Sequence, residues 1–280
     1  MSPDVSGVTQ SVRQLNCPDG TRIDVYSSGS GPAILLVHGW SIDHRSFVPQ
    51  IEPFSRELTV VTYDRRGFGK STAAPDLSAE LDDIDCILNS LGVSQVHLLG
   101  VSQGGRLALR YAATRPERLA SLILQGAVLD GYAVEEPSEE QLPLGYYQEL
   151  ALQGRMDEVR RLWLDHPMMS AGVNDPALRE EIRSLVADYS GADLTATKPP
   201  ARPFDVDVMA ALRKIDLPTL VITGALETLG RKAHARKILE LLRGSREIEM
   251  THSGHLSNLT EAEKYNAAVL AFCRAVESAA

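Results

Sequence analysis

The chain alternates continuous apolar runs with segments whose apolar residues recur at helical spacing. In chain order, the apolar runs are 32–39, 57–64, 95–100, 119–127, 218–224 and 246–250. A strand that is buried on both faces shows such an unbroken run, because neither row of its side chains meets water. The runs therefore predict the strands of a mostly parallel sheet.

Helical patterns occupy the intervals between these runs. Apolar residues recur every three or four positions over 81–91, 107–113, 233–242 and 261–276, and Pro116 ends the second of these segments. Strands that alternate with helices are typical of an α/β fold with right-handed crossovers and helices on both faces of the sheet.

Two segments depart from this alternation. Residues 11–29 form two extended patterns around a Pro-Asp-Gly turn, which predicts an antiparallel N-terminal hairpin. Residues 129–212 contain no clear parallel strand, and prolines separate short helical patterns there. We interpret this stretch as a helical cap inserted into a core domain made of 1–128 and 213–280. A separate helical domain in tandem is the alternative, which we disfavour because sheet strands resume after the insertion.

Composition and charge narrow the class of protein. The chain has 280 residues, of which 44% are hydrophobic and 23% charged, as in an ordinary globular protein, and its net charge is −9. An acidic surface disfavours nucleic-acid binding. No apolar run approaches the roughly 18 residues of a membrane span, and the start lacks a signal-peptide pattern. We therefore expect a cytoplasmic protein without membrane attachment, and we leave open whether it is a monomer or a homodimer.

The sequence offers no clear metal or nucleotide site. The three cysteines are far apart, which suits reduced thiols, and no metal-ligand spacing is present. The segment "DRRGFGKS" at 64–71 contains a glycine-lysine-serine run but lacks the spacing of a phosphate loop. We expect no cofactor and no metal.

Catalytic chemistry is indicated by "HLLGVSQGGRLAL", in which Ser102 lies between Gly100 and Gly104. This G-x-S-x-G pattern joins an apolar strand to an amphipathic helix, the context that a nucleophile elbow requires. A nucleophile on so sharp a turn takes a strained backbone, and glycine two residues to either side avoids collisions. A serine that only caps the helix is the alternative, and the context makes it the weaker interpretation.

The chain resembles the α/β-hydrolase superfamily over nearly its whole length. The matching segments are "LLVHGW", "VVTYDRRGFGKST", "LLGVSQGG", "PTLVITG" and "SGHLSNL", in the order found in that superfamily. The resemblance implies a mostly parallel eight-stranded sheet with an N-terminal antiparallel hairpin, helices on both faces and an inserted helical cap. It does not specify a substrate, because this scaffold hosts many chemistries.

The resemblance also implies roles for individual residues. Ser102 matches the nucleophile, and His255 in "SGHLSN" matches the general base. His252 is its local rival, which we disfavour because the Gly-His pair is the form found in the family. His38 in "VHGW" is interpreted as a structural histidine that shapes the oxyanion loop. The remaining histidines have no motif and are interpreted as surface or packing residues: His44, His97, His166 and His234.

The resemblance places the oxyanion hole on two main-chain N–H groups. One belongs to Gln103, which follows the nucleophile, and the other to Trp40, which follows His38 and Gly39. The Trp40 ring is consistent with two positions, in the wall of the pocket or packed against the cap.

Two residues are candidates for the acid of the triad. The family's usual aspartate position, three residues after the glycine that ends "PTLVITG", is occupied by Glu227. Its extra methylene adds roughly 1.5 Å of reach, which the loop has to accommodate. Asp130 is the second candidate, because some family members carry the acid after the preceding strand. Asp130 is also consistent with a helix N-cap.

We therefore predict a serine hydrolase that cleaves an ester or lactone of a small to medium apolar substrate through an acyl-enzyme. The alternatives are carbon–carbon bond hydrolysis, a lyase or cyclase step, or cofactor-free peroxidase-like chemistry on the same triad, and a ligand-binding protein without catalysis. No Arg or Lys is clearly placed to bind a substrate carboxylate. Bulky candidates for the pocket wall, at least half of which we expect to pack within the cap, are Tyr132, Tyr146, Tyr147, Trp163, Met168 and Met169.

Overall fold

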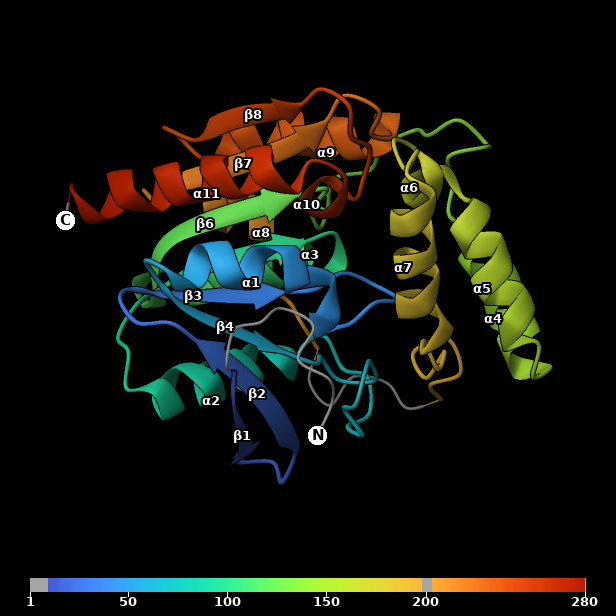
Figure 1. Ribbon diagram of the computed structural model, residues 1–280, viewed down its shortest axis with the longest axis horizontal. Helices are drawn as coiled ribbons and strands as arrows, with labels where there is room; N and C mark the ends of the chain where they lie inside the picture. Colours follow the sequence, from blue (N-terminus) through green and yellow to red (C-terminus); the bar gives the residue numbers. More distant parts are fainter. Residues whose placement is uncertain (1–9, 198–202, 280) are drawn as a thin grey trace.

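A single eight-stranded sheet forms the centre of the molecule. The computed structural model describes residues 10–197 and 203–279, and its strand order is β1-β2-β4-β3-β5-β6-β7-β8 (Figure 1). The hairpin of β1 (Ser11–Asn16) and β2 (Arg22–Ser28) is antiparallel, and β2 is also antiparallel to β4 (Thr59–Tyr63). All other neighbouring strands pair in parallel. The predicted sheet and its N-terminal hairpin are confirmed.

The central strands are covered on both faces, as their apolar runs predict. In chain order the remaining strands are β3 (Ala33–Val37), β5 (Val96–Val101), β6 (Leu119–Gln125), β7 (Thr219–Gly224) and β8 (Arg246–Met250). Every residue of β3, β5 and β7 is buried. Most of β8 is exposed, because it lies at the edge of the sheet.

Alternate side chains of each strand enter different halves of the core. Leu35 and Val37 of β3 join a cluster with helices on one face, whereas Ile34 and Leu36 join a cluster on the other. The first cluster, which we call the core cluster, includes α2 (Glu80–Leu91), α3 (Gln103–Thr114), α8 (Val208–Leu212) and α9 (Leu229–Leu241). The second includes α1 (Val48–Ser55) and α11 (Ala262–Glu277). The two helical layers confirm the predicted α/β architecture.

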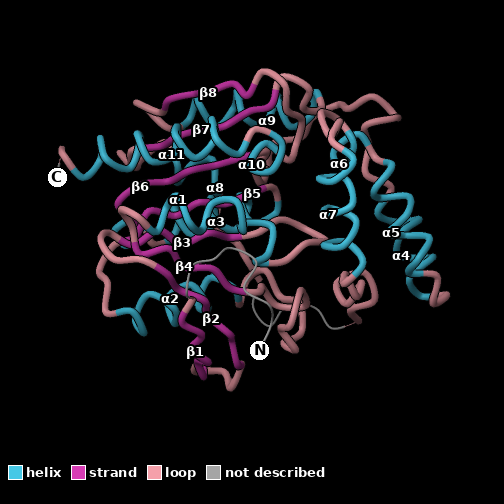
Figure 2. Tube along the Cα trace, viewed as in Figure 1, coloured by secondary structure: helices cyan, strands magenta, loops and turns pink. Residues whose placement is uncertain are grey.

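A group of helices stands apart from these layers. Its members are α4 (Leu144–Leu152), α5 (Met156–Asp165), α6 (Pro167–Ser170) and α7 (Pro176–Ala187). They lie beyond the carboxyl ends of the parallel strands (Figures 1 and 2). Within 129–197 and 203–212 the structure contains no strand, in agreement with the predicted helical character of this segment. We call α4–α7 the cap helices.

The cap helices share a third hydrophobic cluster with loops of the core, and we call it the cap cluster. Trp40, Phe68 and Leu256 from the core pack in it with Trp163 and Tyr189 from the cap side. The ends of the predicted insertion behave differently, because the side chains of Leu129 and of α8 are buried with α3 in the core cluster. The division of the chain into domains at 128 and 213 stays a prediction.

The described helices do not suggest a membrane span. Over 10–197 and 203–279, no helix combines the length and apolar character that crossing a bilayer requires.

Candidate active site

Ser102 occupies a sharp turn between β5 and α3. Its φ of 56° and ψ of −114° lie outside the regions that non-glycine residues favour. Such a backbone costs on the order of 1–3 kcal/mol and persists only where its surroundings hold it. Here the Ser102 N–H donates a 2.7 Å hydrogen bond to the main-chain oxygen of Gln125 on the adjacent strand β6. The strain that the G-x-S-x-G pattern predicts is therefore present.

The two glycines of this pattern are required by close backbone approach. A Cβ atom on Gly104 would lie 2.2 Å from the carbonyl oxygen of Val37, and one on Gly100 would lie 2.5 Å from the oxygen of Gly104. Any side chain at either position would displace α3 from the ends of β3 and β5. The glycines thus allow the helix to begin directly against the sheet, which fixes the turn that carries Ser102.

His255 and Glu227 form a buried pair on the loops that follow β8 and β7. Nδ1 of His255 lies 2.6 Å from Oε2 of Glu227, and the two residues are 3% and 6% exposed. The other carboxylate oxygen accepts a 2.8 Å hydrogen bond from the N–H of Thr228. Because an ionised carboxylate only accepts, Nδ1 carries the proton and Nε2 is left as a proton acceptor.

Two opposing influences set the pKa of Glu227. Burial alone would raise this pKa, but the charge and hydrogen bond of His255, the Thr228 N–H and the nearby Arg231 together hold it below its usual value. Glu227 is therefore ionised across the neutral range, the state in which a carboxylate can fix an imidazole tautomer.

The rival candidates lie elsewhere. Asp130 accepts hydrogen bonds of 2.6 and 2.5 Å from the Nε atoms of Arg106 and Arg110, so its carboxylate joins α3 to the start of the insertion. His252 is exposed, and its N–H donates to Glu261. The structure therefore brings Glu227, and not Asp130, to His255.

His38 is a fully buried residue with both ring nitrogens engaged. Its Nε2 accepts a 3.0 Å hydrogen bond from the N–H of Arg65, and its Nδ1 lies 2.8 Å from the oxygen of Gly39. Burial, and then the charge of Arg65, lowers the pKa of His38 to about 4. It is a neutral residue that joins the loop after β3 to the loop after β4. The other histidines without a motif are half-buried or buried: His44, His97, His166 and His234.

The loop after β3 runs directly beside Ser102. A Cβ atom on Gly39 would lie 3.4 Å from the Cβ of Ser102. Among the described residues, the main-chain N–H groups of Trp40 and Gln103 donate to no acceptor. The Trp40 ring packs in the cap cluster against Tyr147 and Trp163. Of the other bulky candidates, Met168 and Met169 are in this cluster, Tyr132 packs against the core cluster and Tyr146 is exposed.

Sequence reasoning did not identify the residues that lie beneath the histidine–carboxylate pair. Gly126 has a φ of 55°, and a Cβ atom there would lie 2.5 Å from Cε1 of His255 and 3.1 Å from Oε2 of Glu227. The preceding Gln125 contacts both Ser102 and the His255 loop. The available signal was a polar residue and a glycine at the end of the apolar run 119–127. That pattern predicts a turn after the strand, but it does not show that the turn lies next to His255.

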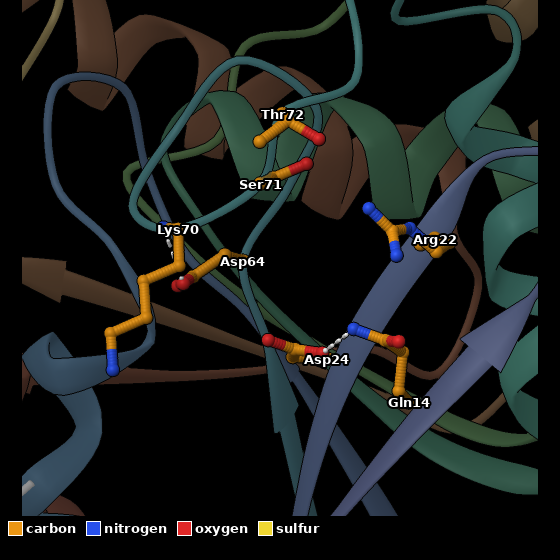
Figure 3. Close-up of a pocket in the computed structure, with 7 residues that line it drawn as sticks. All are labelled: Gln14, Arg22, Asp24, Asp64, Lys70, Ser71 and Thr72. Carbon is orange, nitrogen blue, oxygen red and sulfur yellow. Dashed lines mark hydrogen bonds between the residues drawn. The ribbon is translucent and has the colours of Figure 1, made fainter.

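A small polar pocket lies away from this site. It is lined by Gln14, Arg22, Asp24, Asp64, Lys70, Ser71 and Thr72, from the hairpin and the loop after β4 (Figure 3). Asp64 also groups with Asp43 and His44 at distances that would suit a metal ion. However, Asp64 already accepts from His44 Nδ1 at 2.6 Å and from the Lys70 N–H, and Asp43 is bound by Arg45. These carboxylates are accounted for by loop structure, and "DRRGFGKS" forms part of that loop.

Comparisons with known proteins agree with the observed fold. Residues 32–262 match the family model described as alpha/beta hydrolase fold, and the chain belongs to this family. It is 26% identical over 254 residues to putative carbamate hydrolase RutD of Pseudomonas savastanoi pv. phaseolicola, and this alignment covers 87% of the chain and 94% of the relative. The solved esterase EaEST of Exiguobacterium antarcticum aligns with a TM-score of 0.79 at 26% identity, covering 94% of this chain and all of the esterase.

One relative is much longer. The chain is 27% identical over 289 aligned residues to polyketide synthase ThaQ of Burkholderia thailandensis, and this match spans 95% of the chain but only 13% of the synthase. The family and its relatives identify the chain as a hydrolase.

Proposed function

We propose that this hydrolase cleaves carboxylic esters or lactones with a Ser102–His255–Glu227 triad. The observation that carries the proposal is the 2.6 Å contact between His255 Nδ1 and Glu227, together with a serine at φ 56° whose turn is linked to the His255 loop through hydrogen bonds of Gln125. A buried carboxylate that fixes an imidazole, next to a strained serine, is the arrangement that acyl transfer through a covalent intermediate needs.

Each residue has a step in this mechanism. Ser102 Oγ attacks the substrate carbonyl while His255 Nε2 takes its proton, and ionised Glu227 stabilises the resulting imidazolium. The oxyanion accepts hydrogen bonds from the N–H groups of Trp40 and Gln103. His255 then gives the proton to the leaving alkoxide, which departs as an alcohol. Water attacks the acyl-enzyme by the same route in reverse, which releases the acid and restores Ser102.

The surroundings favour an apolar, small to medium acyl or alcohol group. The cap cluster contributes Trp40, Tyr147, Trp163, Met168 and Leu256, and its helices lie beyond the carboxyl ends of the strands (Figure 1). Aromatic and thioether side chains supply apolar contact area, whereas the few polar groups near Ser102 would orient the reacting carbonyl. The partner of the protein in this proposal is the small-molecule substrate alone.

A covalent probe tests the proposal most directly. A fluorophosphonate should label Ser102, as located by peptide mass spectrometry, and p-nitrophenyl acetate to octanoate should be hydrolysed. Ser102→Ala should abolish labelling and reduce turnover by at least about 10³-fold. Absence of any label on Ser102 would contradict catalysis by this serine. Labelling without hydrolysis of any ester or lactone in a broad panel would favour the other chemistries of the same triad.

A further inference from the structure

Gln125 is the one residue of β6 that hydrogen-bonds to both the nucleophile turn and the histidine loop. Its main-chain oxygen accepts from the N–H of Ser102 at 2.7 Å. Its side-chain Nε2 donates to the main-chain oxygen of His255 at 2.8 Å and to Oδ1 of Asn258 at 3.0 Å. Gln125 is 1% exposed, so these contacts form away from water.

The position of β6 in the sheet explains why its last residue can do this. β6 lies between β5, which ends at the Ser102 turn, and β7, which ends at the Glu227 loop. Gly126 follows Gln125 and leaves room for the His255 ring at its Cβ position. The end of β6 therefore hydrogen-bonds to the Ser102 turn and the His255 loop through Gln125, and Gly126 lies against the paired side chains of His255 and Glu227.

The histidine loop is fixed from its other side by a buried amide chain. Asn258 Nδ2 donates to the oxygen of Ser46 at 2.9 Å, and Gln50 Nε2 donates to the oxygen of Asn258 at 2.8 Å. Gln50 also donates to Asn266 at 3.0 Å. Gln125 is the member of this chain of amides that contacts His255 itself.

The Gln125 amide carries a cost that its packing does not require. Its Oε1 is buried and has no hydrogen-bond partner among the described residues. A buried acceptor without a partner destabilises the fold, whereas an apolar side chain of similar length would avoid that cost. The amide is therefore better explained by what its N–H groups do at His255 than by packing alone.

We propose that Gln125 is a positioning residue that sets the separation of Ser102 and His255. The proposal rests on the hydrolase function argued above. Without the Gln125 side chain, the His255 loop is held by Asn258 but is no longer hydrogen-bonded to the strand that holds Ser102. A displacement of about 1 Å between reacting groups can reduce the rate about 100-fold.

The test compares Gln125→Met with Thr62→Val. Both changes remove a buried side-chain oxygen that has no hydrogen-bond partner among the described residues, but Thr62 lies on β4, which β3 separates from β5. With a p-nitrophenyl ester, Gln125→Met should lower kcat about 10- to 100-fold with KM within about threefold, whereas Thr62→Val should retain kcat. Thermal unfolding of both variants checks that a lower kcat does not reflect a loss of folded protein.

The outcomes separate this proposal from the function on which it rests. An inactive wild-type protein that takes no fluorophosphonate label would remove the hydrolase proposal itself. An active wild type together with a Gln125→Met variant that keeps the kcat of the wild type and of Thr62→Val would overturn only the role of Gln125. Gln125→Leu serves as a second variant should the methionine reduce folding, with kcat measured per mole of folded, probe-reactive protein.

Discussion

Glu227 reaches His255 despite having one more methylene than aspartate because its loop is tied to the loop before the histidine. The N–H of Ala225 donates to Met250, and that of Leu226 donates to Ser253. The N–H of Glu227 donates to Gly224, which closes a tight turn. These hydrogen bonds fix the backbone of Glu227 relative to the His255 loop. The backbone position therefore suits the longer side chain of glutamate.

Replacing Glu227 by Gln should lower kcat about 10³- to 10⁴-fold, with little change in the free energy of unfolding. The amide has the same shape but neither stabilises the imidazolium nor enforces the Nδ1-protonated tautomer. Steady-state kinetics with an activated ester measure the effect. Asp130→Asn is the control, since Asp130 binds Arg106 and Arg110 instead, and it should change kcat less than threefold. A larger loss in Asp130→Asn than in Glu227→Gln would reverse the assignment of the acid.

Gly126 offers a second test at the scale of one residue. Gly126→Ala would place a methyl group 2.5 Å from the His255 ring, so the ring has to move and kcat should fall about 100-fold. Gly92→Ala is the matched control, because Gly92 also has positive φ, 68°, but a Cβ there meets nothing within 4 Å. In urea titrations Gly126→Ala should also be destabilised more than Gly92→Ala, because only its methyl group meets buried atoms. Equal kcat in the two variants would show that Gly126 matters only for backbone conformation.

Local patterns were sufficient for some residues and not for others. The elbow around Ser102 was predictable because the constraint on its backbone is local, and the His255 and Glu227 positions followed from the family resemblance. Gln125 and Gly126 were not predictable, since their contacts join β6 to a loop about 130 residues away. No spacing along the chain encodes that proximity.

At the scale of elements, the buried strands were predictable because burial on both faces removes polar residues from them. The cap helices were harder to place. Their apolar residues show that each helix has a buried side, but Trp163 could pack within the cap or on the core. The structure shows that Trp163 Nε1 donates to Ser41 of the core at 2.5 Å and that its ring packs on Trp40. Such pairing depends on the direction of each helix, which the pattern leaves free.

Asp193 connects the cap side to the core, and we expect its carboxylate to hold the cap in place. One carboxylate oxygen accepts from Trp40 Nε1 and the other from the Tyr189 hydroxyl, both at 2.6 Å. Asp193→Ala should cost about 1.5–3 kcal/mol, because hydrogen bonds to a charged acceptor are lost. Amide hydrogen exchange should accelerate in α7 but not in β5.

Asp188 provides the comparison for this prediction. It also links the cap side to the core, through Arg45, but both side chains of that ion pair are exposed. Asp188→Ala should therefore cost less than about 1 kcal/mol and leave exchange in α7 unchanged. If the two alanine variants lose equal stability, the partly buried hydrogen bonds of Asp193 do not hold the cap.

At the scale of the whole molecule, buried neutral histidines make stability depend on pH. Burial lowers the pKa of His38 to about 4, and burial with the charge of Arg231 lowers that of His234 to about 4. In the unfolded chain each histidine titrates near its ordinary value of 6.5. Between pH 6.5 and 4 the unfolded state thus binds more protons, so stability falls as the pH is lowered. Asp64, with a pKa lowered to about 2, adds its loss only at more acidic pH.

The free energy of unfolding should therefore fall by about 2 kcal/mol for each of these two histidines between pH 8 and pH 5. Urea titrations at the two pH values measure the change. His234 accepts a hydrogen bond from the Leu129 N–H, which a glutamine oxygen can also accept, so His234→Gln should be tolerated and should remove the share of His234 in the pH dependence. A pH dependence that is the same in His234→Gln as in the wild type would mean that His234 is protonated in the folded protein at pH 5.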